Sequence, residues 1–187
     1  MKTTEKINAL HRVEPCLEVG CGKRKSKDSI GLDIRLSKVV DILGDLEQTL
    51  PFKEESFQTV IADQVVEHID NFVELMTEFH RILKKDGKLI IHVPYFRSSW
   101  SHIDPTHVRS FTLLGFDYWL SDSFIHEQYG FDQQTFTKIE KYLDADYPLH
   151  PIRWILAKAA IRFPHLYENS MFSFLFPFQQ LSVVCIK

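Results

Sequence analysis

The chain has 187 residues, which is the length of one ordinary domain and enough to bury a sizeable core. Its 22 basic and 25 acidic residues give a net charge of −3, so the overall charge does not indicate a nucleic-acid partner. The start of the chain lacks the apolar core of a signal peptide, and no run of about 18 apolar residues could span a bilayer, so we expect a cytoplasmic protein. The three cysteines, Cys16, Cys21 and Cys185, include no CxxC pair and are expected to be reduced thiols.

The first predicted elements are short. Residues 1–12 predict no more than a loose lead-in or a short helix, and apolar runs predict strands over Cys16–Val19 and Ser29–Ile34. Only Lys23–Asp28 lies between a glycine turn and the second of these strands, which is too short for a full helical crossover. The first helix should therefore be reduced to a turn or a short loop. A third strand is predicted over Val39–Leu43.

The next elements have clearer patterns. Thr59–Ala62 is nearly continuous in apolar character, as buried parallel strands are. Apolar residues recur at helical spacing over Asn71–Leu83, with Asp70 or Asn71 as a cap and Asp86-Gly87 as a stop. A fifth strand is predicted over Lys88–Val93.

The remainder alternates loops, helices and strands. Tyr95–Arg109 is predicted to be a loop, and Leu113–Leu120 a helix capped by Thr112. Strands that alternate with helices predict an α/β domain, doubly wound. The last predicted elements are a strand over Phe136–Leu143, a helix over Ile152–Ile161 and a strand over Gln180–Ile186.

A glycine turn follows the first predicted strand. Leu17–Gly22 reads Leu-Glu-Val-Gly-Cys-Gly, and Gly31-Leu32-Asp33 ends the second strand. This is the local design for holding an adenosine-containing cofactor at the carboxyl edge of a parallel sheet. A dinucleotide fingerprint would need a third glycine where the chain has Lys25, and an acidic residue about 20 residues further on, so Asp33 comes too early. No Gly-Lys-Ser/Thr follows the turn, which also excludes a Walker loop.

The ordered series of short motifs resembles the class I S-adenosylmethionine-dependent methyltransferases. A later segment, Asp-Pro-Thr-His-x-Arg-x-Phe-Thr from Asp104, resembles one found in small bacterial methyltransferases of the type 11 kind. The resemblance is ordered and covers about residues 15–94. The motifs that carry it are Leu17–Gly22, Gly31–Asp33, Gly44–Leu46, Ala62–Ile69 and Arg81–Leu89.

The resemblance implies a Rossmann-like, doubly wound, mostly parallel seven-stranded sheet with a reduced first helix and a helical insertion before the last strand. Residues 1–187 would form a single methyltransferase domain. About 15–94 would be the cofactor-binding half, and about 95–187 would supply the acceptor-side loop, helices and final strands.

S-adenosylmethionine is the cofactor that the resemblance implies, with S-adenosylhomocysteine as product. Gly20 and Gly22 have no Cβ and so let the backbone approach the cofactor closely. Glu18 would orient the turn and meet the methionine ammonium, directly or through water. Asp33 would accept hydrogen bonds from both ribose hydroxyls.

Further acids follow the third and fourth predicted strands. By the same resemblance, Asp45 and Leu46 would lie at the adenine, and Asp63 or Gln64 near the methionine portion. The alternative is that each acid caps a helix or a turn. The complete predicted cofactor set is Glu18, Gly20, Cys21, Gly22, Asp33, Ile34, Asp45, Leu46, Asp63 and Gln64.

The loop Tyr95–Arg109 is the candidate acceptor region, because it mixes His, Asp, Arg and aromatic residues at the carboxyl edge. His102, Asp104 and His107 are the predicted catalytic residues, since either histidine could take a proton near neutral pH. Asp104 precedes a proline, so a purely structural role is the alternative. These three side chains could be a metal triad, but no fourth ligand is evident and no metal is predicted. His68 is interpreted as a packed or capping residue.

Residues 150–178 carry a heavy apolar load interspersed with Arg153, Lys158 and Arg162. The favoured interpretation is a helical insertion that covers the sheet or the acceptor pocket. A peripheral membrane contact, or an oligomer interface, is the alternative.

The sequence therefore predicts a methyltransferase whose acceptor is a small molecule, a saccharide or a lipid-linked intermediate. A non-catalytic S-adenosylmethionine-binding module with a regulatory or assembly role is the second hypothesis, and a nicotinamide oxidoreductase is the third. The fold alone cannot choose the substrate.

Overall fold

A computed structural model describes residues 3–129, 134–144 and 150–187. It contains one seven-stranded sheet. The strands are β1 Cys16–Val19, β2 Ile30–Asp33, β3 Ile42–Leu43, β4 Phe57–Asp63, β5 Leu83–Pro94, β6 Lys138–Leu143 and β7 Gln180–Ile186.

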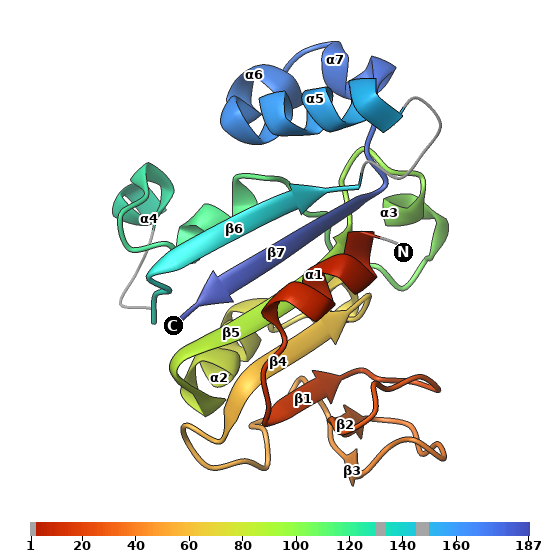
Figure 1. Cartoon of the computed structure of the whole chain (residues 1–187), viewed down its shortest axis with the longest axis vertical. Helices are drawn as coiled ribbons and strands as arrows, with labels where there is room; N and C mark the ends of the chain where they lie inside the picture. Colours follow the sequence, from red (N-terminus) through yellow and green to blue (C-terminus); the bar gives the residue numbers. More distant parts are fainter. Residues whose placement is uncertain (1–2, 130–133, 145–149) are drawn as a thin grey trace.

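The strand order is β3-β2-β1-β4-β5-β7-β6 (Figure 1). The strands from β3 to β5 pair in parallel, whereas β7 lies antiparallel between β5 and β6. The predicted mostly parallel α/β sheet is confirmed. Its parallel strands end at one common edge, which is where ligands bind in open α/β sheets.

Helices cover both faces of this sheet, with α1 on one face and α2 on the other (Figure 1). The start of the chain, predicted as a loose lead-in or a short helix, contains the helix α1. The α-helices are α1 Thr3–His11, α2 Phe72–Ile82, α3 Trp100–Ile103, α4 Phe124–Tyr129, α5 His150–Arg162, α6 Pro164–Glu168 and α7 Phe172–Leu175, and the 3₁₀ helices are η1 Val66–His68 and η2 Gly115–Trp119.

Side chains of β4 point alternately into two hydrophobic cores, one on each face of the sheet. Val60 and Ala62 pack in the larger core with Phe79 of α2, while Ile61 packs in a smaller cluster with Ile7 of α1. Successive side chains of a strand point to opposite faces, so one apolar run fills both cores. This explains the continuous apolar character of the strand.

The connection from β1 to β2 contains no helix, although the structure describes every residue of it. The predicted reduction of the first helix is confirmed. The third strand is shorter than the predicted Val39–Leu43 because the side chain of Asp41 replaces a backbone partner of β2. Its Oδ2 accepts the Gly31 N–H at 2.8 Å and the Lys25 ammonium at 2.7 Å. Regular pairing starts only at Ile42.

The predicted helix Asn71–Leu83 is confirmed to within one residue at each end, but Asp86-Gly87 is not its stop. Helix α2 ends at Ile82, and β5 begins at once with Leu83 opposite Phe57, while its next paired residue is Lys88. The residues between bulge out of the ladder with Asp86 at φ +59°, so this glycine-containing turn shapes a strand instead of stopping a helix.

The start of α2 is also held differently from the prediction. Asn71 occupies the N-cap position, but its side chain forms no capping hydrogen bond. Glu47 instead accepts the backbone N–H groups of Asp70 and Asn71 at 2.7 and 3.0 Å. A carboxylate from a distant loop therefore fixes the backbone that leads into the helix.

The acceptor-side half has more short helices than predicted. The loop Tyr95–Arg109 contains the one-turn helix α3, and the predicted helix Leu113–Leu120 is the 3₁₀ helix η2. Thr112 Oγ1 accepts the Gly115 N–H at 3.1 Å, but the N-cap residue of η2 is Leu114 and not the predicted Thr112. Helix α4 was not predicted, since an element of six residues shows little periodicity.

The predicted helical insertion lies between β6 and β7, where α5, α6 and α7 form a layer beyond the β6 edge (Figure 1). In the part of the chain that the structure describes, none of the helices combines the length and apolarity needed to cross a membrane.

Candidate functional site

The glycine turn after β1 adopts a left-handed backbone at two positions. Gly20 has φ +60° and Gly22 has φ +57°, where a side chain would be strained. A Cβ on Gly20 would lie 2.4 Å from Cγ2 of Val65, whereas one on Gly22 would meet nothing within 4 Å. Gly20 is thus required by packing against the segment after β4, while Gly22 leaves open space at the carboxyl edge.

Asp33 ends β2 beside this turn. Its side chain is almost buried, and its Oδ2 accepts the Gly22 N–H at 2.8 Å while its Oδ1 accepts the Arg35 N–H at 2.8 Å. Each carboxylate oxygen has a second lone pair available for another donor. A fixed acid next to an open glycine backbone fits a ribose with two hydroxyl groups.

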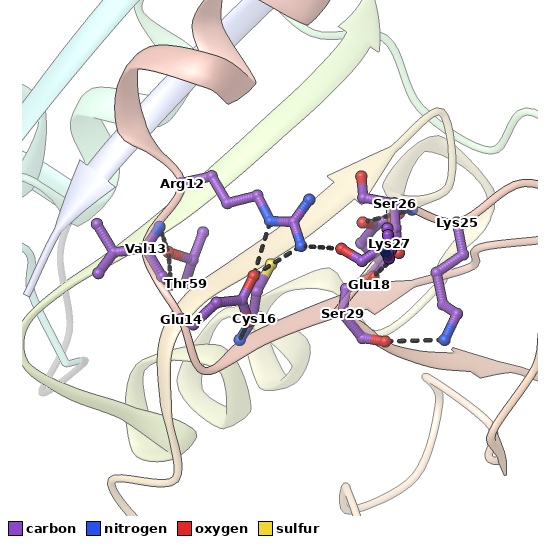
Figure 2. Close-up of polar contacts among 10 residues, drawn as sticks. All are labelled: Arg12, Val13, Glu14, Cys16, Glu18, Lys25, Ser26, Lys27, Ser29 and Thr59. Carbon is purple, nitrogen blue, oxygen red and sulfur yellow. Dashed lines mark hydrogen bonds and ion pairs between the residues drawn. The ribbon is translucent and has the colours of Figure 1, made fainter.

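Glu18 stabilises the loop that replaces the missing helix. Its two carboxylate oxygens lie 3.0 and 3.2 Å from the backbone nitrogen of Ser26 (Figure 2). Between Glu18 and Asp33, the thiol of Cys21 has a raised pKa, chiefly because it is buried and also because both acids repel the thiolate. Cys21 therefore stays protonated at neutral pH and is suited to packing, not to nucleophilic chemistry.

The remaining predicted cofactor residues lie at the ends of the neighbouring strands. Ile34 is 66 % exposed directly after Asp33, while Leu46 is buried. Asp45 Oδ1 accepts the Glu47 N–H at 3.0 Å, which is the turn role foreseen as its alternative.

The end of β4 completes this edge. Asp63 and Gln64 are exposed there, and Gln64, with φ +52°, donates its N–H to the carbonyl of His92 at 2.9 Å. The structure thus brings the predicted cofactor residues to the one edge where parallel strands end.

The three predicted catalytic side chains have different contacts. His102 is exposed on α3, with Nε2 3.3 Å from the carbonyl of Phe96. Asp104 Oδ1 accepts from the hydroxyl and the N–H of Thr106 at 2.7 and 2.9 Å, and these bonds hold the pKa of Asp104 below its usual range. His107 instead faces Glu67.

Glu67 is a site residue that the sequence analysis did not select. It lies on η1 directly after β4 and is 1 % exposed, and neither carboxylate oxygen has a hydrogen-bond partner among the described residues. Burial, together with repulsion from Asp63 and Asp104, raises the pKa of Glu67 to about 7. Nε2 of His107 lies 4.0 Å from Glu67 Oε1, and the rings of His68 and His107 meet edge to face at 4.7 Å. The sequence signal that could have pointed to Glu67 is the Glu67-His68 pair shortly after the carboxyl end of β4.

The strand order, the antiparallel β7, the glycine turn and the acid at the end of β2 together define a class I methyltransferase fold. Residues 21–91 match the family model described as a methyltransferase domain, which is consistent with a class I methyltransferase of the type 11 kind.

A curated relative agrees over part of its length. An uncharacterized protein of Methanocaldococcus jannaschii is 36 % identical over 90 residues, which is 41 % of this chain and 39 % of that protein. The match therefore spans well under half of the relative.

Solved structures show the same fold over nearly the whole chain. A SAM-dependent methyltransferase from Archaeoglobus fulgidus has a TM-score of 0.59 at 16 % identity, and the alignment covers 99 % of this chain and 95 % of that one. A putative methyltransferase of Haloferax volcanii, solved with a methyltransferase activator, has a TM-score of 0.61 at 19 % identity and coverages of 98 % and 88 %. Phosphoethanolamine N-methyltransferase 2 of Haemonchus contortus, in complex with S-adenosyl-L-methionine, has a TM-score of 0.58 at 14 % identity and coverages of 99 % and 52 %.

Proposed function

We propose that this protein is an enzyme that transfers a methyl group from S-adenosylmethionine to an acceptor bound beside the loop Tyr95–Arg109. The observation that carries the proposal is the Asp33 carboxylate, held 2.8 Å from the N–H of Gly22 next to open space. This pair lies within the segment that matches the methyltransferase family. The acceptor is a small molecule, a saccharide or a lipid-linked intermediate.

Each part of the carboxyl edge would hold a different part of the cofactor. Asp33 would accept the ribose hydroxyls, and the backbone from Gly20 to Gly22 would lie against the cofactor. The exposed Ile34 would contact adenine together with the Asp45-Leu46 segment, while Asp63 and Gln64 would face the methionine portion. When bound, the cofactor supplies a methyl group that its sulfonium sulfur has already activated for displacement.

The chain's own contribution is to align the acceptor and to manage a proton. Holding two reactants in line can supply much of the rate of such a displacement. An oxygen or nitrogen acceptor also loses a proton, and the exposed imidazole of His102 on α3 is the predicted residue best placed to receive one from a bound molecule. His107, which faces Glu67, and Asp104, which accepts from Thr106, would assist His102 indirectly.

Helices α5 to α7 offer a surface on which a lipid-linked acceptor could be presented. Their basic residues are Arg153, Lys158 and Arg162, while their only acidic residue, Glu168, is buried. Exposed apolar residues next to basic ones favour the boundary of an anionic membrane. The apolar residues of this surface that are more than half exposed are Ile152, Trp154, Ile155, Phe163, Leu166, Met171, Phe172, Phe174 and Leu175.

The test combines cofactor binding with methyl transfer. The protein is incubated with methyl-labelled cofactor and fractionated cell extract, and label is followed into saccharide, lipid, protein and small molecules. Asp33→Ala should weaken S-adenosylhomocysteine binding by about 10- to 100-fold, because hydrogen bonds to a charged group are worth about 1.5–3 kcal/mol. Asp28→Asn, at an exposed position with φ +70° that Asn tolerates, is the matched control.

The outcomes separate the hypotheses. Equal binding by Asp33→Ala and the wild type would contradict the cofactor site. Normal binding with no label transferred to any fraction would favour the non-catalytic module. Tight NAD binding with no affinity for S-adenosylhomocysteine would favour the oxidoreductase.

A further inference from the structure

Three side chains at the carboxyl edge are arranged as metal ligands. Glu67, His68 and His107 each offer one ligand atom, and these atoms lie within 4.8 Å of one another. Two of the residues follow β4 and the third follows β5, so the sheet topology brings them together. A bond of about 2.0–2.1 Å to zinc puts two ligand atoms about 3.4 Å apart in a tetrahedral shell, so shifts of about 1 Å would close the site.

The buried carboxylate is the observation that points to a ligand. Glu67 is 1 % exposed, and the described residues provide no hydrogen-bond donor for either oxygen. Its nearest ionisable partner is Nε2 of His107 at 4.0 Å, which is beyond hydrogen-bond distance. A buried acid without donors is costly unless a cation or a proton satisfies it.

Both imidazoles are oriented with a nitrogen lone pair left over. Nδ1 of His107 lies 3.3 Å from the carbonyl of Ser101, which can only accept, so this nitrogen carries the hydrogen. Nε2 of a neutral His107 therefore keeps its lone pair on the side of Glu67. A metal-bound histidine commonly donates its other ring N–H to a carbonyl or carboxylate in this way.

His68 is oriented through a short relay. Its Nδ1 lies 2.9 Å from Thr106 Oγ1 and 3.3 Å from the Thr106 carbonyl. Thr106 in turn donates its hydroxyl hydrogen to Asp104 at 2.7 Å, so the oxygen accepts from the ring. Asp104 and Thr106 are thus positioning residues, and Nε2 of His68 is the free nitrogen.

We propose that Glu67, His68 and His107 bind a divalent first-row transition ion, of which zinc is the best match. Two imidazoles and one carboxylate suit such ions, whereas magnesium and calcium prefer oxygen ligands alone. Three protein ligands leave a coordination position for water or an external oxygen atom. The sequence grouping of His107 with His102 and Asp104 did not predict this site, because Glu67 is adjacent only in space.

Equilibrium dialysis against zinc sulfate, with metal analysis of the protein, tests the proposal directly. We expect one zinc per chain in the wild type, and a loss of affinity of at least about 100-fold in Glu67→Gln and His107→Gln. Thr106→Val should weaken zinc by about 10-fold, because it breaks the relay without removing a ligand. His102→Gln, a neighbouring histidine outside the cluster, should bind zinc like the wild type.

A second readout guards against misfolding and against confusion with methyl transfer. Cobalt bound to the wild type should give a visible absorption band that Glu67→Gln and His107→Gln lose, while circular dichroism reports their fold. Should Glu67→Gln not fold, His107→Gln and Thr106→Val still decide the question. No zinc in the wild type, or equal zinc in both ligand variants, would overturn the proposal. Neither measurement depends on the proposed transferase activity.

Discussion

The carboxyl edge of the sheet and the helical insertion before β7 differ in what their side chains do. At the edge, the Asp33 and Glu18 carboxylates accept backbone N–H groups, so polar side chains fix the local backbone. In the insertion, large apolar side chains such as Leu166 and Met171 face outward, at 68 % and 74 % exposure. Polar side chains therefore order the backbone in the first region, whereas apolar side chains form the outer surface of the second.

The attachment of the insertion differs accordingly. One carboxylate, Glu168 of α6, accepts the hydroxyl of Tyr95 at 2.8 Å and the N–H of Leu113 at 2.7 Å, all in the buried interior. Ala157, Ala160 and Tyr167 add apolar burial. A few buried contacts therefore hold a layer whose outer face is available for another role.

The largest effect is expected from a substitution in the glycine turn. Gly20→Val should lower the free energy of unfolding by about 4 kcal/mol, because its side chain would overlap Val65 and adopt a left-handed backbone. Gly22→Ala, which has the same backbone strain but no clash, should cost only about 1 kcal/mol. Urea unfolding measures both.

Cofactor affinity distinguishes the roles of Gly20 and Gly22 further. Gly22→Ala should weaken S-adenosylhomocysteine by more than its stability cost explains, because a Cβ would enter the open space beside Asp33. Titration calorimetry on the folded variant measures this. Equal stability of the two variants would show that Val65 does not constrain the turn.

The next effect tests the attachment of the insertion. Glu168→Ala should lower the free energy of unfolding by about 3 kcal/mol, since it leaves the Tyr95 hydroxyl and the Leu113 N–H without an acceptor. Glu168→Gln keeps an acceptor oxygen and should cost much less. Cofactor affinity should stay within about twofold in both, because neither Tyr95 nor Leu113 belongs to the predicted cofactor residues. A large loss of cofactor affinity would contradict the separation of the two regions.

Sequence reasoning predicted the parallel strands and the glycine turn because their signals are local. β7 was predicted at Gln180–Ile186 with both of its bounds, and Asp33 ends β2 as expected. The Glu67 cluster could not be predicted, because its members meet only when β4 and β5 lie side by side. Likewise, Glu47 stabilises the start of α2 from a distant loop, which no helix-capping pattern contains.

The smallest predicted effect concerns the surface of the insertion. Vesicles containing phosphatidylglycerol and phosphatidylcholine at 3:7 should bind the protein, and binding should weaken as salt is raised. Lys158→Ala combined with Arg162→Ala should weaken it by about 30-fold, since each basic residue near an anionic surface contributes about 1 kcal/mol. Lys84→Ala combined with Lys85→Ala, which removes the same charge from the bulge at the start of β5, is the control.

In this last test, vesicle binding should depend on where the positive charges lie and not only on how many there are. Lys158 Nζ lies 3.7 Å from the centre of the Trp154 ring, so its ammonium sits among the exposed apolar side chains that would enter the interface. If both double variants lost the same vesicle affinity, net charge alone would explain the binding. The proposal that the insertion forms the membrane-binding surface would then be wrong. A dimer seen by sedimentation and abolished only by the Lys158 and Arg162 variant would instead assign this surface to a second copy of the chain.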